Sequence, residues 1–331
     1  MNCIYLKKKS DKFSKMRHPW IFKNSVEKIE EHNQTNAYRL IYSEADMLPG
    51  LIVDRYGDFL VIQALTAGID NIKHILANNL MQLVNPLGIY ERSDSDVRKL
   101  EGLEPVKGQL LGTLPPEYVE IKENGFLFLA DIIKGQKTGL FLDQRNNRRI
   151  TGKYAKNKNI LDCFSYTGGF TVYAKACGAY SVTCIDSSEN ANLIAQKNFI
   201  LNKILSGIEM INENVFTTMR KYRDYGKTFD MIIIDPPKLA PTRLHTDKAI
   251  RAYKDLNLLA MKLLTQGGIL AAFSCSGGIN AKLFREMISW AAIDAGKEIQ
   301  ILETLSQGPD HPIRINFPES EYLKGLILRI L

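Results

Sequence analysis

Residues 159–170 read NILDCFSYTGGF, a short apolar run that ends in an acid and leads into a turn with two glycines. We expect a buried strand here and a helix that opens at the glycines, because glycine lets the backbone approach a ligand closely. From this point to Leu331, apolar runs alternate with stretches of helical periodicity. The expected strands are Ile160–Phe164, Ser181–Asp186, Ile208–Ile211, Asp230–Asp235, Gly268–Ser274, Ile299–Leu305 and Leu323–Leu331.

Two features of these runs predict an α/β fold. Met231–Ile234 is continuously apolar, which is typical of a parallel strand buried on both faces of its sheet. Helical periodicity at Glu189–Asn202 and Thr246–Leu264 separates successive strands. Repeated strand–helix units predict a doubly wound, mostly parallel sheet. The last strand follows without another helix, so we expect it to run antiparallel.

Residues 37–133 have a different pattern, which predicts a small α+β domain. Apolar runs on both sides of Tyr56-Gly57-Asp58 indicate a β-hairpin, and Asn71–Leu83 has helical periodicity. Pro105–Pro116 is expected to be a loop, and Lys134–Arg149 a connector that leads into a helix. The expected parts of the chain are a basic arm at 1–36, the small domain at 37–133 and the doubly wound domain at 134–331.

The composition excludes several classes of protein. Hydrophobic residues make up 45% and charged residues 24% of the 331, which is typical of a soluble globular chain and excludes intrinsic disorder. No apolar run approaches the roughly 18 residues of a membrane span, and the first residues do not resemble a signal peptide. The five cysteines form no CxxC pair, so we expect neither disulfides nor a metal site. The expected location is the cytoplasm, without membrane attachment.

The net charge of +7 is concentrated at the N-terminus. Seven lysines and arginines but only one acid, Asp11, fall within residues 1–23, which therefore carry +6. A localised basic arm favours a polyanionic partner such as RNA, because neutralised phosphates release counterions. A solvated tail that aids solubility would have the same composition.

The acids at the first two strand ends favour one cofactor class. Asp162 lies just before a turn that lacks the GxGxxG pattern, and its charge would repel a pyrophosphate but attract the cationic amino group of a methionine moiety. Asp186 ends the second strand, where a carboxylate can bind both hydroxyls of a ribose. Together they favour S-adenosylmethionine over a dinucleotide. A purely structural role for the glycines and Asp186, in turns and helix caps, remains the alternative.

Two later strand ends carry candidate reactive groups. Asp235 precedes Pro236 and Pro237, which would hold its carboxylate rigidly outward to receive the amidine edge of a nucleobase; an ordinary strand-ending turn is the alternative. Cys275 lies between two serines at the end of the fifth strand. A thiol of ordinary pKa is only about 3% thiolate at pH 7, so a nucleophile there needs a nearby cation or a helix N-terminus, such as the one expected near Asn280. A packed structural role is the alternative, and Cys163, Cys177 and Cys184 are expected to be core thiols.

Five separated blocks then resemble one family. They are Thr138–Arg148, Phe164–Phe170, Asp235–Lys238, Phe273–Ser276, and His311-Pro312 with Pro318-Glu319 and Tyr322–Gly325. In this order they resemble class I methyltransferases of the RlmI type, which methylate carbon 5 of cytosine in large-subunit (23S) ribosomal RNA. His18–Phe22 resembles a motif of the family's N-terminal PUA RNA-binding domain. Most of that domain has no counterpart here, since the chain reaches Tyr38 within about fifteen residues.

The resemblance implies a Rossmann-like methyltransferase domain that uses S-adenosyl-L-methionine and binds ribosomal RNA. It implies roles in cofactor binding for Asp162, Phe164, Tyr166 and Gly168 at the methionine end, Asp186 at the ribose, Asn214 at the adenine, and Gln144, Arg145 and Asp235 around the site. Asn214 stands where the family usually has aspartate. The substrate base would lie against Pro236, Pro237 and Lys238, the last replacing a second cysteine found in some RNA cytosine methyltransferases.

The implied chemistry is covalent. Cys275 adds to carbon 6 of cytosine, carbon 5 takes the methyl group, and Asp235 hydrogen-bonds the ring nitrogen and amino group. The general base that removes the carbon 5 proton is unassigned. Two alternatives stay open: an RNA methyltransferase acting on a base nitrogen, and a non-catalytic RNA-binding assembly factor. The sequence does not fix the oligomeric state, and a homodimer is compatible with it.

Deleting residues 1–23 tests the function of the basic arm. We expect weaker RNA binding and a flatter dependence of the logarithm of affinity on the logarithm of salt concentration, because up to seven phosphate contacts are lost. RNA titrations at several salt concentrations measure this slope. A slope equal to that of the intact chain would contradict a role for the arm in RNA binding.

Overall fold

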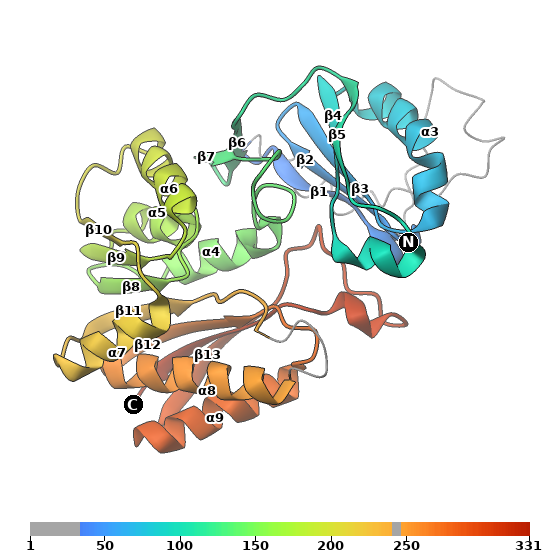
Figure 1. The fold of residues 1–331 in the computed structure, drawn as a ribbon. Coiled ribbons are helices and arrows are strands. Elements are labelled where there is room, and N and C mark those ends of the chain that lie inside the picture. Colours follow the sequence, from blue (N-terminus) through green and yellow to red (C-terminus); the bar gives the residue numbers. More distant parts are fainter. Residues whose placement is uncertain (1–33, 240–245) are drawn as a thin grey trace. The chain divides into compact units, whose positions relative to one another are not determined.

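The computed structural model describes residues 34–239 and 246–331 (Figure 1). The basic arm and the His18–Phe22 motif therefore lie outside the described residues. The described residues divide into two compact units: those up to Asp143 together with Gly308–Ser320 form unit 1, and those from Gln144 to Gln307 together with Glu321–Leu331 form unit 2. Within the described residues, no helix has both the length and the hydropathy that crossing a membrane requires.

Unit 1 contains a five-stranded sheet in the order β1-β2-β3-β4-β5. Its strands are β1 (Ala37–Tyr42), β2 (Leu51–Tyr56), β3 (Phe59–Ala64), β4 (Gly88–Ser93) and β5 (Val106–Gly112). The expected hairpin is confirmed, since β2 and β3 pair antiparallel with Tyr56 opposite Phe59. Helix α3 (Ala67–Val84) connects β3 to β4, which pair parallel. Unit 1 also has the hairpin β6 (Val119–Glu123) and β7 (Phe126–Ala130), and short 3-10 helices at Ser43–Asp46, Asp96–Glu101 and Pro318–Ser320. A further 3-10 helix, Leu142–Gln144, includes the point where the chain passes from unit 1 to unit 2.

One sequence prediction in unit 1 is wrong. Pro105–Pro116 is not a loop throughout, because Val106–Gly112 forms β5 and pairs antiparallel with β4. The strand lies at the edge of its sheet, and none of its residues is fully buried. In its sequence, VKGQLLG, the alternation is short: Gly108 has no side chain to mark the inner face, and Leu110 and Leu111 are adjacent.

Unit 2 contains a seven-stranded sheet in the order β10-β9-β8-β11-β12-β14-β13. Its strands are β8 (Asn159–Cys163), β9 (Ser181–Ile185), β10 (Ile208–Ile211), β11 (Phe229–Ile234), β12 (Leu264–Ser274), β13 (Ile299–Leu305) and β14 (Lys324–Ile330). All seven predicted strands are present, and only β12 begins more than one residue from its expected start. The last strand, β14, runs antiparallel to both of its neighbours, as expected.

Helices cover both faces of this sheet. Figure 1 shows α4, α5 and α6 on one face and α7, α8 and α9 on the other. The helices are α4 (Arg145–Gly152), α5 (Gly169–Ala176), α6 (Glu189–Leu201), α7 (Val215–Asp224), α8 (Thr246–Leu263) and α9 (Ala281–Ala295). Met231–Ile234 is buried along its whole length, as a strand covered on both faces must be.

The cysteines of unit 2 are in part where the sequence predicts them. Cys163 and Cys184 are buried, as expected of core thiols. Cys177 is exposed instead, because α5 ends at Ala176 and Cys177 is the residue that caps its C-terminus. An apolar neighbourhood in sequence does not reveal this, since burial at a helix end depends on where the last turn stops.

Candidate active site

The loop after β8 is bent sharply and fixed to the end of β9. Phe164, Tyr166 and Gly168 all have a positive φ, between +49° and +76°. For residues other than glycine this conformation costs about 1–2 kcal/mol each. The Asp186 carboxylate compensates by accepting hydrogen bonds from the backbone N–H groups of Tyr166 and Ser188, both at 2.9 Å. Asp186 therefore has the structural role of a turn cap, while its oxygens retain further lone pairs for a ligand.

Helix α6 packs against the same loop. The Nδ2 atom of Asn198 donates to the carbonyl oxygen of Thr167 at 2.9 Å, in a fully buried position. A Cβ atom on Gly168 would lie 2.5 Å from the ring of Phe199. Only glycine fits here, because the site combines this close contact with a positive φ.

Asp162 provides a buried acid below this loop. Its side chain is 1% exposed, and one oxygen, Oδ2, accepts a hydrogen bond of 2.7 Å from the hydroxyl of Thr171. The other oxygen, Oδ1, accepts no hydrogen bond from the described residues. Burial raises the pKa of Asp162 to about 7, and the charges of Asp235 and Asp186 act in the same direction. A cationic group placed against Oδ1 would satisfy this oxygen and stabilise the ionised carboxylate.

A chain of amides orients the carboxylate of Asp235. Nε2 of Gln144 donates to Oδ1 of Asp235 at 2.9 Å, and Nδ2 of Asn147 donates to Oε1 of Gln144 at 2.6 Å. Gln144 and Asn147 are buried, as is Arg145, the first residue of α4. The expected proximity of Gln144 to Asp235 is therefore present. Asn147 was not predicted, although its spacing of three residues from Gln144 on a helical segment is the signal for such a contact.

Cys275 lies beside the proline loop. It follows the last residue of β12, is half-buried, and places its Sγ 3.9 Å from the carbonyl oxygen of Pro236. Pro236 is buried, whereas Pro237 and Lys238 are exposed. The structure therefore brings the thiol close to the residue that follows the Asp235 carboxylate, rather than burying it in the core.

Two polar side chains that the sequence analysis did not single out surround the Cys275 segment. The hydroxyl of Tyr253 is 3.0 Å from Oγ of Ser276, and burial raises the pKa of Tyr253 to about 12. Nζ of Lys324 donates to the carbonyl oxygen of Ser276 at 2.8 Å. Lys324 lies within the quoted block Tyr322–Gly325, and a lysine at the head of an apolar run is the signal that could have identified it.

The comparisons with known proteins agree with this geometry. Residues 104–328 match the family model of the S-adenosylmethionine-dependent methyltransferases. The chain belongs to this family. Its relatives include "Ribosomal RNA large subunit methyltransferase I" of Tolumonas auensis, 48% identical over 90% of this chain and 76% of that protein, and of Escherichia coli strain K12, 46% identical over 92% and 77%.

Two solved structures have a similar fold. SMU.776, a putative methyltransferase complexed with SAH, is 25% identical, with a TM-score of 0.82 over 93% of this chain and 78% of that one. Trm5b from Pyrococcus abyssi is 17% identical, with a TM-score of 0.61 over 84% and 74%, which shows a likeness of fold alone.

The residues of this methyltransferase fit its cofactor. S-adenosylmethionine carries a cationic amino group, and the unsatisfied Oδ1 of Asp162 is an acceptor for such a group. Asn214, expected at the adenine, is exposed and caps α7, with its Oδ1 accepting from the N–H of Thr217 at 3.2 Å. This cap was not foreseen, and the adenine contact stays a prediction.

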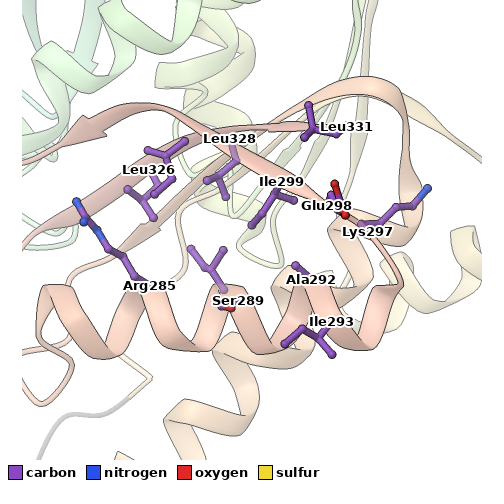
Figure 2. A pocket seen from close by; sticks show the side chains of 12 residues that line it. Arg285, Ser289, Ala292, Ile293, Lys297, Glu298, Ile299, Leu326, Leu328 and Leu331 are labelled. Atoms are coloured by element: carbon purple, nitrogen blue, oxygen red, sulfur yellow. The ribbon is translucent and has the colours of Figure 1, made fainter.

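A groove elsewhere in the methyltransferase unit contains none of the predicted site residues. It lies between α9 and the edge of the sheet, as Figure 2 shows, with Ala292 and Ile293 on the helix and Ile299, Leu326 and Leu328 on the strands. Its lining is largely apolar and offers neither the acids nor the thiol found at the strand ends.

The raised pKa of Asp162 predicts a pH dependence of cofactor binding. Below pH 7 the carboxyl is mainly protonated in the free protein, so binding a cation there requires it to lose a proton. We expect the affinity for S-adenosylmethionine to rise about tenfold from pH 5 to 6 and to level off above 7. Calorimetric titrations at each pH measure this.

Two variants control for other titrating groups. D162N should bind weakly and with little pH dependence between 5 and 7. D230N is the matched control, because Asp230 is a carboxylate near the amino end of β11, where its Oδ2 accepts from the N–H of Asn159. An unchanged pH profile in D162N would contradict the role of Asp162.

Proposed function

We propose that this methyltransferase modifies carbon 5 of a cytosine in large-subunit ribosomal RNA through a covalent adduct with Cys275. The observation that carries the proposal is the half-buried Cys275 thiol, which lies 3.9 Å from the carbonyl oxygen of Pro236, the residue that follows Asp235. A nucleophile and a carboxylate are thereby available to one base. The relatives named as ribosomal RNA methyltransferases support ribosomal RNA as the substrate. The protein would then act in the cytoplasm, where ribosomes assemble.

The cofactor is assigned to the strand ends β8, β9 and β10. Its amino group would pair with Asp162, and its ribose would bind Asp186. The backbone of the bent loop would form the floor of the methionine end. The full set of proposed cofactor contacts is Asp162, Phe164, Tyr166, Gly168, Asp186, Asn214, Gln144, Arg145 and Asp235. When bound, S-adenosylmethionine supplies an electrophilic methyl group.

Cys275 performs the addition and the elimination. Its thiolate forms a bond from Sγ to carbon 6 of cytosine, and the electron pair of the ring double bond makes carbon 5 nucleophilic. After carbon 5 has gained the methyl group, it loses its proton, and the S–C6 bond breaks to restore the double bond and the thiolate.

Asp235 stabilises the charge that develops during addition. Its carboxylate would accept a hydrogen bond from the amino group of cytosine. It would accept a second from the ring nitrogen, which takes up a proton from solvent as the S–C6 bond forms and returns it when that bond breaks. Gln144 donates a hydrogen bond to this carboxylate, and Asn147 holds Gln144 in place with a second one. Little reorganisation of the carboxylate is therefore needed during the reaction. Pro236, Pro237 and Lys238 would contact the base.

The target base must be accessible. Extracting a base from a duplex costs a few kcal/mol, so a loop or an assembly intermediate is the easier substrate. Lys238 is exposed on the proline loop, so its side chain is available to such a substrate.

RNA that contains 5-fluorocytosine tests the covalent step. Fluorine cannot leave carbon 5 as a proton does, so with S-adenosylmethionine present we expect a stable protein–RNA adduct on denaturing gels. C275A should form no adduct and should lose at least about a thousandfold in methyl transfer, because the attacking group is gone. C177A, which removes an exposed thiol of the same unit, should form the adduct normally.

The same experiment separates the alternatives. Full methyl transfer by C275A without any adduct would replace this proposal with methylation of a base nitrogen, which needs no thiol. Cofactor binding without methyl transfer to any ribosomal RNA, naked or in particles, would favour a non-catalytic assembly factor.

A further inference from the structure

Lys324 is a buried lysine at the same edge of the sheet as Cys275. It is the first residue of β14, and the antiparallel direction of this strand brings its start to the edge where β8, β9, β11 and β12 end. In the β12–β14 register, Lys324 lies opposite Ser274, the residue before Cys275. Only 6% of Lys324 is exposed. Lysines are almost never buried unless their charge has a partner, so this position requires an explanation.

Main-chain carbonyls hold the amino group of Lys324. Nζ donates to the oxygen of Ser276 at 2.8 Å and to the oxygen of Tyr322 at 2.7 Å. Within the described residues, no carboxylate lies within ion-pair distance of Nζ. The two carbonyls fix the nitrogen against the segment that carries Cys275, and they favour the ammonium form because both accept hydrogen bonds.

The charges that face Lys324 come from three places. Cys275 and Glu321 favour its protonation, whereas Lys238 on the proline loop opposes it. Burial outweighs these charges and lowers the pKa of Lys324 to about 8. At pH 7 the group is therefore still about nine-tenths protonated. Because no carboxylate among the described residues neutralises this buried ammonium, its charge is available to stabilise an anion that forms close to it.

We propose that Lys324 is a positioning residue for Cys275 and that its buried ammonium group stabilises the Cys275 thiolate. This inference rests on the proposed function, in which Cys275 attacks as a thiolate. Loss of the thiol proton to solvent leaves a sulfur anion beside a fixed cation, in a half-buried site where the attraction is stronger than in water. Between successive turnovers the ammonium keeps its place, because its two carbonyl partners do not change.

The other groups around the thiol serve this role less well. Tyr253 is neutral at physiological pH, since burial raises its pKa to about 12. Asp235 carries a negative charge that opposes a thiolate. Helix α9 begins six residues after Cys275, and its first turn is already capped by Asn280, whose Oδ1 accepts from the N–H of Leu283 at 2.8 Å. Lys238 is a cation but is exposed to solvent, which screens its charge.

Alkylation of Cys275 across a pH range tests the inference without RNA. The intact protein is treated with iodoacetamide between pH 5.5 and 9.5, and the rate at the Cys275 peptide is followed by mass spectrometry. We expect a midpoint below about 8.5 in the wild type. K324M should move the midpoint up by about 1 pH unit, because the charge is lost. K324R, which keeps a cation, should restore most of the difference.

Cys177 is the internal control, because the alkylation rate of its exposed thiol is measured in the same digest. Its dependence on pH should be the same in all variants. A Cys275 midpoint at or above that of Cys177 in the wild type would overturn the inference even if K324M failed to fold. Equal midpoints in folded K324M and wild type would also overturn it, whether or not the 5-fluorocytosine adduct forms. A shifted midpoint without any adduct would uphold Lys324 and overturn the cytosine chemistry alone.

Discussion

Parallel pairing of four strands is the constraint on which the site depends. β8 pairs parallel with β9 and β11, and β11 pairs parallel with β12, so all four end at one edge of the sheet. Residues that lie far apart in sequence, from Asp162 to Cys275, are therefore brought to one edge without any local motif joining them. The antiparallel β14 then adds the start of a strand, and with it Lys324, to the same edge. Sheet topology thus assembles acids, a thiol and an amine in one place.

Electrostatics give this edge a preference for positive ligands. Three carboxylates approach one another, and burial together with the charges of Asp235 and Asp186 raises the pKa of Asp162 to about 7. A cofactor with a cationic amino group relieves this repulsion, whereas a pyrophosphate would increase it. At Cys275 the positive charge of Lys324 offsets the negative charge of these carboxylates. The site therefore favours a cation beside Asp162 and a thiolate at Cys275. The backbone of the loop after β8 is strained, since Phe164 and Tyr166 have positive φ angles. The Asp186 carboxylate stabilises this conformation by accepting a hydrogen bond from the N–H group of Tyr166.

Apolar runs were enough to predict the seven strands of unit 2. The signal is strongest in β8, β9, β11 and β12, which are largely buried and differ sharply from the helices between them. The same logic missed β5, an edge strand in which no residue is fully buried, and misplaced Cys177, whose exposure follows from the last turn of α5. Strand ends identified Asp162, Asp186, Asp235 and Cys275 as candidates. Lys324 was missed because its partner, the carbonyl of Ser276, is distant in sequence. Asn147 was missed because its contact with Gln144 matters only through the bond from Gln144 to Asp235, which is also distant in sequence.

The identity of the methylated nucleoside tests the central claim most directly. Ribosomal RNA from cells that lack this protein is incubated with the purified chain and S-adenosylmethionine that bears a deuterated methyl group, then digested to nucleosides for mass spectrometry. We expect the label to appear in 5-methylcytidine. Label in a nucleoside methylated on nitrogen, with none in 5-methylcytidine, would contradict it.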